Sequence, residues 1–333
     1  MTDAWPNPVF ETALAYHRTA ALTAAVKLDI FSLIGAGSTT VDAIALKTDA
    51  SPRGLRILCD YLTVIGLLQK QDSNYNLTPA AGRFLDRSSP LVLGSCVDFL
   101  AAPEMLALVL DDPVSYVRRG GSDGLTVLAP DHPIWVRFAR AMAPFAAPGA
   151  KRVAAYVATL PESPRTVLDV AAGHGLYGIE VAKAVPMAVV TAVDWAEILA
   201  IAQENAKTAG VDDRFRTVVG SAFDVEWGDG FDLVLLPNIL HYFDRDKCVA
   251  LLRRVKASIS PTGRILAVEF VPNPDRVSPP LQATFAFFTL ATCPSGDAYT
   301  LDDLDGIARA AGFRGITARP LSPTAQTLVA FET

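Results

Sequence analysis

Residues 168–178 read LDVAAGHGLYG and combine two signals that decide the fold. The apolar run at residues 166–170 has the composition of a buried strand, and it leads into a G-x-G-x-x-G pattern made by Gly173, Gly175 and Gly178. A strand, a tight glycine turn and a helix N-terminus together form a unit that receives the phosphate or nucleoside part of a cofactor. The turn alone does not tell a dinucleotide from another adenosyl cofactor.

Strand-like and helix-like segments alternate downstream of this turn. Strands rich in Val, Ile, Leu and Phe are predicted at residues 166–170, 188–193, 215–219, 231–236 and 264–271. Helices are predicted at residues 176–184, 196–209 and 247–259. This alternation indicates a parallel sheet covered on both faces, with its ligand at the carboxyl ends of the strands.

The chain ends differently from a dinucleotide-binding domain. Residues 313–319 and 327–331 are predicted as two strands with no helix between them, so they should pair antiparallel. The predicted fold class is therefore α/β, with a seven-stranded, mostly parallel sheet that closes with an antiparallel hairpin.

Asp194 ends the second predicted strand, downstream of the glycine turn. A carboxylate at this position can accept both hydroxyls of a ribose. It could instead cap the helix predicted at residues 196–209. Together with the glycine turn, Asp194 favours a nucleoside site.

The first hundred residues follow another pattern. One long helix is predicted over residues 7–34, a threonine-capped helix over residues 39–48, a helix opened by Ser51-Pro52, and a hairpin that turns at Asp72. This order is typical of a winged helix-turn-helix. DNA binding needs several phosphate contacts, yet residues 1–100 carry eight Lys/Arg against nine Asp/Glu. A role in packing or dimerisation is therefore expected.

Bulk properties narrow the class of protein. The 29 Lys/Arg and 35 Asp/Glu give a formal net charge of −6, which argues against a nucleic-acid partner. The four cysteines are scattered, which favours a reducing compartment and argues against a disulfide frame or a metal site. No apolar run reaches the roughly 18 residues needed to cross a bilayer, and the first thirty residues carry charges that a secretion signal would lack. We expect a cytoplasmic protein.

Three parts are predicted along the chain. Residues 1–110 form the winged-helix-like part, and residues 163–333 form the cofactor-binding domain. Residues 111–162 link them with two helices, at residues 133–147 and 149–160.

Four segments carry a resemblance to a known family: TVLDVAAGHG, VVTAVDW, VVGSAFDVEWGDGFDLVLLPNILHYFDRDKCVALLRRV and GRILAVEFVP. They resemble the S-adenosylmethionine-dependent small-molecule O-methyltransferases, the caffeate- and flavonoid-type plant enzymes and their bacterial relatives in carotenoid and antibiotic pathways. The resemblance covers nearly the whole chain, because those proteins also begin with a winged-helix dimerisation domain. It implies a class I methyltransferase fold, a homodimer, and transfer of methyl from S-adenosylmethionine to a hydroxyl of an aromatic or polyketide-like acceptor, with S-adenosylhomocysteine as product.

The resemblance also implies roles for individual residues. His241 would be the general base, and Glu269 would orient it. The acceptor pocket would include Phe138, Met142, Thr289 and Cys293. The cofactor-binding residues would be Asp169, Ala171, Gly173, Gly175, Asp194, Trp195, Ser221, Ala222 and Phe223.

These roles suit the chemistry. A phenol with a pKa near ~10 is mostly protonated at neutral pH, and a neutral imidazole can take its proton as attack on the methyl begins. A carboxylate behind the imidazole fixes its tautomer and stabilises the imidazolium. Two other interpretations stay open: His241 could cap the helix that starts near Asp244, and Glu269 could pair elsewhere.

The chain departs from the family pattern at several positions. Ala171 and Ala172 replace two glycines of the turn, so ordinary backbone dihedrals are expected there. Ala298 replaces a second orienting glutamate, and Tyr242 and Phe243 replace the usual Asp-Trp after the base. The acceptor could therefore be a carboxylate, a carbon or an acidic enol. A non-methylating, ligand-sensing protein and an NAD-dependent oxidoreductase are the two alternative functions.

Overall fold

The structure is a computed structural model that describes residues 7–321 and 325–333. Contacts between residues divide the chain into two compact units, Met1–Met105 and Leu106–Thr333.

The first unit is a bundle of short helices with one hairpin. Its core contains Phe31, Ile44, Leu55, Leu62 and Tyr75, all nearly inaccessible to solvent. Strand β1 pairs antiparallel with β2, as predicted. The elements are α1 (Asn7–Ala13), α2 (Tyr16–Lys27), α3 (Ile30–Gly35), α4 (Val41–Thr48), α5 (Pro52–Val64), β1 (Leu68–Gln71), β2 (Asn74–Leu77), α6 (Pro79–Phe84) and α7 (Val97–Leu100).

The single helix predicted over residues 7–34 is wrong, because this segment forms α1, α2 and α3. Asp29 adopts a left-handed backbone with φ of 56°, which a right-handed helix cannot continue through. Its carboxylate accepts a hydrogen bond of 2.7 Å from the Ser32 hydroxyl, and this contact stabilises the turn into α3. The apolar spacing on either side keeps a helical period, so the break leaves no trace in that pattern.

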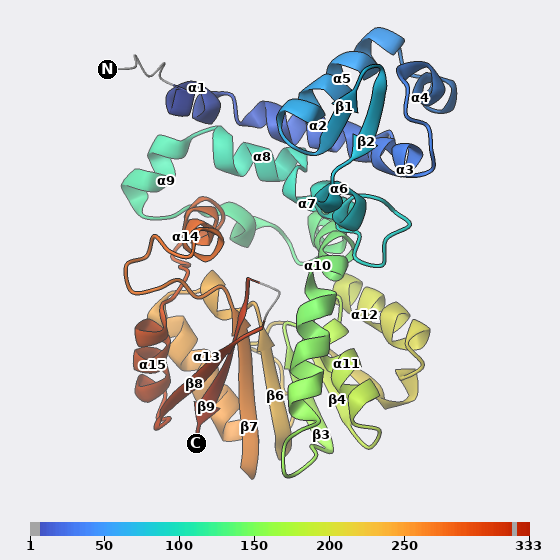
Figure 1. The fold of residues 1–333 in the computed structure, drawn as a ribbon. Helices are drawn as coiled ribbons and strands as arrows, with labels where there is room; N and C mark the ends of the chain where they lie inside the picture. The colour runs from blue at the N-terminus through green and yellow to red at the C-terminus, as the bar shows by residue number, and fades with distance from the viewer. Residues whose placement is uncertain (1–6, 322–324) are drawn as a thin grey trace. The chain divides into compact units, whose positions relative to one another are not determined.

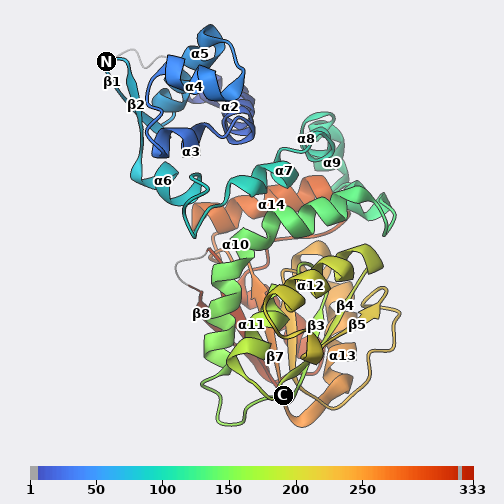
Figure 2. The same cartoon turned by 90° about the vertical axis from the view of Figure 1, so that its right-hand side faces the viewer.

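The second unit is built on one seven-stranded sheet with strand order β5-β4-β3-β6-β7-β9-β8 within the described residues (Figures 1 and 2). The first five strands in this order, β5, β4, β3, β6 and β7, are parallel to one another. Strand β9 is antiparallel to both β7 and β8. The predicted fold class is confirmed. The strands are β3 (Thr166–Val170), β4 (Val189–Asp194), β5 (Phe215–Val219), β6 (Phe231–Pro237), β7 (Ile259–Glu269), β8 (Gly315–Pro320) and β9 (Thr327–Glu332).

Alternate residues of each strand face opposite layers of helices. In β3, for example, Val167 packs with α10, α11 and α12, whereas Leu168 packs with α13 and α15. Figure 2 shows α10, α11 and α12 lying over the nearer face of the sheet. The remaining helices are α8 (Pro103–Leu110), α9 (Pro113–Arg119), α10 (Pro133–Val157), α11 (Leu176–Ala184), α12 (Ala196–Thr208), α13 (Arg245–Ser258), α14 (Pro280–Thr292) and α15 (Leu301–Ala310).

Helix α10 corrects another prediction. Residues 133–157 form one helix rather than two, although Pro144 and Pro148 lie inside it. An internal proline costs about 3 kcal/mol because it removes a backbone hydrogen bond and crowds the preceding turn. Close packing compensates: a Cβ on Gly149 would already lie 3.2 Å from the Tyr177 hydroxyl and the Gln326 amide oxygen.

Candidate functional site

A cavity of about 350 Å³ opens at the carboxyl ends of β3, β4, β5 and β6. This is where ligands bind in parallel α/β sheets, and β3 is the point at which the strand order reverses. The wall comes from the four loops after these strands and from residues before and within α10. Its polar and aromatic members include Trp135, Phe138, His174, Tyr177, Asp194, Trp195, Ser221, Phe223, Asn238, Tyr242 and Phe243.

The residues of the glycine turn have two roles: some line the cavity, and others allow close packing of neighbouring elements. Gly173 has φ of 57° and open space where a Cβ would lie, and it lines the cavity. Gly175 and Gly178 are packing positions instead, because a Cβ would lie 2.8 Å from the Ala202 Cβ and 2.7 Å from the Val190 Cγ1, respectively. Ala171 also lines the cavity, but its φ of 53° is left-handed, so the expectation of ordinary dihedrals is wrong.

Asp194 ties the turn to the next strand. Its Oδ2 accepts a 2.8 Å hydrogen bond from the Gly173 amide, and its Oδ1 accepts one of 2.8 Å from the Trp195 amide. Asp194 does not cap α12, whose N-cap residue is Trp195. Burial raises the pKa of the Asp194 carboxyl to about 6, because the charged form is partly removed from water. Each carboxylate oxygen keeps a lone pair for a hydroxyl group in the cavity.

Asp169 lies beneath the turn and does not line the cavity. Its Oδ2 accepts a 3.0 Å hydrogen bond from the Gly178 amide, while its Oδ1 has no partner among the described residues. Burial raises the pKa of this carboxyl well above its usual range. In this structure Asp169 holds the first turn of α11 to β3.

His174, in the glycine turn, lines the cavity. Its Nδ1 accepts a 3.2 Å hydrogen bond from the Leu176 amide, so the proton of the neutral ring lies on Nε2. Burial lowers the pKa of His174 to about 4, so the ring is neutral at physiological pH.

The loop after β5 carries Ser221, Ala222 and Phe223 into the cavity wall. Sequence reasoning missed the residue that holds this loop. The Arg254 guanidinium, on α13, donates a 2.7 Å hydrogen bond to the Phe223 carbonyl and another to the Val225 carbonyl. It also lies over the Trp227 ring, 4.3 Å from its centroid.

His241 and Glu269 form a buried pair. The His241 Nδ1 lies 2.6 Å from the Glu269 Oε2, and both side chains are 4% exposed. The second carboxylate oxygen, Oε1, accepts hydrogen bonds from the amides of Ile239 (3.1 Å) and Leu240 (2.8 Å). The two alternative interpretations are therefore wrong: Asp244, not His241, caps α13, and Glu269 pairs with the histidine.

The neighbours of the imidazole are aromatic. The Tyr242 ring centroid lies 4.5 Å from that of His241, and the Phe285 centroid lies 4.8 Å away in an edge-to-face contact. Phe285 stacks in turn on Phe270 and Phe288. Tyr242 lines the cavity, whereas His241, which packs against the Tyr242 ring, does not.

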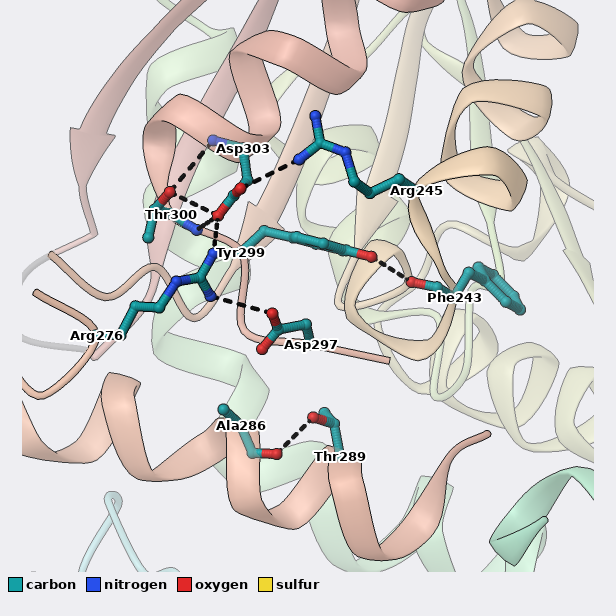
Figure 3. A network of polar contacts seen from close by, with 9 residues as sticks. All are labelled: Phe243, Arg245, Arg276, Ala286, Thr289, Asp297, Tyr299, Thr300 and Asp303. Carbon is teal, nitrogen blue, oxygen red and sulfur yellow. Dashed lines mark hydrogen bonds and ion pairs between the residues drawn. The ribbon is translucent and has the colours of Figure 1, made fainter. Parts of the chain in front are cut away.

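Figure 3 shows a polar network that includes Asp297, Arg276, Asp303 and Arg245, and Asp297 connects it to the backbone of His241. The Asp297 amide donates a 3.1 Å hydrogen bond to the His241 carbonyl, while the Asp297 carboxylate pairs with Arg276 at 3.1 Å. Arg276 and Arg245 both pair with Asp303, at 2.5 and 3.1 Å. The Asp297 carboxylate is paired with Arg276, so it does not orient His241. Asp297 therefore does not take the place of the second glutamate, whose position Ala298 occupies.

One of the four predicted acceptor-pocket residues lines the cavity. Phe138 lines the cavity, but Met142, Thr289 and Cys293 do not. Thr289 and Cys293 are fully buried, and the Thr289 hydroxyl donates to the Ala286 carbonyl of its own helix (Figure 3).

The fold and the cavity define a class. A seven-stranded sheet with an antiparallel end, and a nucleoside-type cavity over the strand tips, form the architecture of class I S-adenosylmethionine-dependent methyltransferases. Residues 116–314 match the model of the O-methyltransferase domain, and residues 10–87 match that of the O-methyltransferase dimerisation domain. The chain belongs to this O-methyltransferase family, and the predicted resemblance is confirmed.

Individual relatives agree with this assignment. The chain is 28% identical to 3-hydroxy-5-methyl-1-naphthoate 3-O-methyltransferase of Streptomyces sahachiroi, over 98% of this chain and 94% of that protein. It is 24% identical to the tetracenomycin polyketide synthesis 8-O-methyl transferase of Streptomyces glaucescens, over 89% and 87%. A crystal structure of a protein assigned as an O-methyltransferase from Nostoc punctiforme PCC 73102 is 41% identical over 99% of both chains, with a TM-score of 0.94.

The chain is thus an S-adenosylmethionine-dependent O-methyltransferase. No helix in residues 7–321 and 325–333 is long and apolar enough to cross a membrane. The same residues contain no group of His, Cys, Asp and Glu side chains that could hold a metal ion.

Proposed function

We propose that this enzyme methylates a hydroxyl group of a small aromatic or polyketide-like acceptor, with His241 as general base and Glu269 as its orienting partner. The observation that carries the proposal is the 2.6 Å contact between His241 Nδ1 and Glu269 Oε2 beside an apolar cavity.

The cavity fits the cofactor. S-adenosylmethionine supplies an electrophilic methyl group on a sulfonium. The open space at Gly173 admits ligand atoms close to the backbone, and the carboxylate of Asp194 is suited to the ribose hydroxyls. Ala171 and Trp195 line the same side, while Ser221, Ala222 and Phe223 would flank the adenine. Asp169 and Gly175 support the turn from beneath.

The Glu269 carboxylate selects the tautomer of the neutral imidazole. Because Glu269 accepts the Nδ1 proton, the His241 Nε2 is left as the basic nitrogen, and it has no protein partner among the described residues. His241 then takes the proton of the acceptor hydroxyl, and the buried carboxylate stabilises the imidazolium that forms. Catalysis also requires alignment of the acceptor oxygen with the methyl group in a dry pocket.

The side chains that line the cavity indicate the class of methyl acceptor. Trp135, Phe138, Tyr242 and Phe243 offer flat apolar surfaces, which suits a planar ring better than a charged chain. The named substrates of the two Streptomyces relatives are of this kind. We include Phe138 in the acceptor pocket, with residues 111–162 contributing part of its wall. Met142, Thr289 and Cys293 remain predicted pocket residues only, because they do not line this cavity.

One experiment tests the proposal. Wild-type protein and His241→Ala are assayed with tritiated-methyl S-adenosylmethionine against a panel of phenols, quinols and carboxylates. We expect methylation of at least one phenol, a large loss of turnover in the variant, and unchanged affinity for S-adenosylhomocysteine. Methyl transfer to carboxylates alone, or full turnover by the variant, would overturn the assigned base.

We further propose that the protein is a homodimer through residues 1–110, acts in the cytoplasm and binds no nucleic acid. The match of residues 10–87 to a dimerisation domain supports this assembly. Light scattering at micromolar concentration checks it, and a monomer would contradict it.

A further inference from the structure

We propose that the Tyr242 hydroxyl binds the methyl acceptor by donating a hydrogen bond to a second oxygen that neighbours the methylated hydroxyl. The substrate class is then narrowed from phenols in general to phenols with an adjacent oxygen. This inference rests on the proposed function of the same site.

The Tyr242 side chain is in an unusual position for a phenol. Its hydroxyl has no hydrogen-bond partner among the residues that the structure describes, and the side chain is half-buried with access to the cavity. Tyrosine hydroxyls at the edge of an apolar site usually find a hydrogen-bond partner. By contrast, Tyr299 nearby donates a 2.6 Å bond to the Phe243 carbonyl. Since Tyr242 lines the cavity, its hydroxyl is available to a ligand there.

The position of Tyr242 relative to His241 selects the acceptor over other ligands. The two ring centroids are 4.5 Å apart, and the planes are tilted by 38°. A hydroxyl that gives its proton to His241 therefore lies beside the Tyr242 ring. We infer that an oxygen on the neighbouring position of the same acceptor accepts from this phenol, whereas an isolated hydroxyl would offer it no partner.

The charge state of Tyr242 fixes the direction of this bond. Burial raises the pKa of the phenol, because the phenolate would be poorly solvated in this apolar site. Tyr242 is therefore a neutral O–H, and it donates to a carbonyl or hydroxyl oxygen of the acceptor.

The test uses two matched probes, 2,3-dihydroxynaphthalene and 2-naphthol, which differ by the neighbouring oxygen. The rate constant kcat/KM for each is measured with wild type, Tyr242→Phe and the control Tyr156→Phe, which removes a hydroxyl on α10 that lies outside the cavity. We expect wild type to favour the diol, and Tyr242→Phe to reduce this preference about five- to tenfold. Tyr156→Phe should keep the wild-type preference.

The outcomes separate this inference from the proposed function. Equal effects of Tyr242→Phe on both probes, with methylation retained, would overturn the inference alone. Weaker binding of S-adenosylhomocysteine by Tyr242→Phe would also overturn it, because the phenol would then contact the cofactor. If wild type methylates neither probe, calorimetry on the S-adenosylhomocysteine complex provides the same comparison, and equal affinity or no binding for both probes would overturn the inference.

Discussion

The Nδ1 atom of His241 and the Oε2 atom of Glu269 are 2.6 Å apart, in a site where both side chains are 4% exposed. The two residues come from the loop after β6 and from the end of β7, neighbouring parallel strands of one sheet. Their contact is thus a direct result of strand order, and it leaves the second imidazole nitrogen for chemistry.

Glu269→Gln tests this contact without removing the side chain. The amide oxygen can still accept from the Ile239 and Leu240 backbone, but the imidazole loses its charged partner. We expect kcat to fall about 10²-fold with little change in affinity for S-adenosylhomocysteine. Steady-state assays and calorimetry check this, and an unchanged kcat would show that the carboxylate has no catalytic role.

Gly173→Ala should weaken cofactor binding beyond its effect on stability. Gly173 and Gly210 both have positive φ, 57° and 69°, and both have open space where a Cβ would lie, but only Gly173 lines the cavity. Each alanine should cost about 1–2 kcal/mol of unfolding free energy through backbone strain. Thermal melts and S-adenosylhomocysteine titrations of both variants separate the effects, and equal affinities would contradict the assignment.

Ala171→Gly should be tolerated or stabilising. An alanine at φ of 53° carries about 1–2 kcal/mol of strain, and glycine relieves it while adding about 0.4–1 kcal/mol of unfolded-state entropy. We expect the free energy of unfolding to rise by up to about 1.5 kcal/mol in denaturant melts. A clear loss of stability would show that the methyl group of Ala171 makes packing contacts that outweigh the strain.

Cofactor affinity should depend on pH through Asp194. Its pKa of about 6 in the free protein means that the carboxyl is increasingly protonated below pH 6, and the protonated form accepts fewer hydrogen bonds. Affinity for S-adenosylhomocysteine should be constant above pH 7 and fall by up to about tenfold per pH unit below 6. Calorimetry from pH 5 to 8 measures this, and Asp194→Asn should abolish the slope.

Protonation of Asp194 should affect folding stability in the opposite direction to its effect on cofactor affinity. A carboxyl whose pKa is raised by folding binds more protons in the folded state, so its contribution to stability increases as the pH falls from 6 towards 4. His174 acts in the opposite direction: burial lowers its pKa from 6.5 to about 4, so the unfolded ring binds a proton in this window while the folded ring does not. Its contribution to stability therefore decreases as the pH falls, and it offsets part of the gain from Asp194.

Arg254→Met should raise the KM for S-adenosylmethionine several-fold and leave kcat nearly unchanged. The guanidinium holds the Phe223 and Val225 carbonyls, so its loss releases the loop that would flank the adenine. Arg253→Met is the matched control, because Arg253 is the preceding residue of α13 but donates to the Ala310 carbonyl and not to the loop after β5. Equal KM values for the two variants would contradict a positioning role.

Sequence reasoning recovered features with a local physical cause. The bounds of β3 and α11 were predicted to the residue, because an apolar strand, two glycines and a helical pattern follow one another there. Thr40 and Ser51 cap α4 and α5 through their own side chains, and such caps are visible in sequence.

Features that depend on distant packing were not recoverable. The left-handed Asp29 breaks a helix whose periodicity is continuous, and α10 persists through Pro148 because α11 and Gln326 pack against it. The His241–Glu269 pair came from resemblance, since the residues are 28 positions apart. No sequence signal indicates that Arg254 supports the loop after β5.

Glu269 has two separate tasks, since Oε2 meets the imidazole while Oε1 binds two backbone amides. A descendant that abandoned methyl transfer would still be under selection to keep this glutamate, because the turn after β6 would lose its anchor without it. The histidine has no comparable second duty in its side chain. Across paralogues, survival of the glutamate alone therefore reports ancestry, and survival of the histidine is the better guide to whether chemistry has been retained.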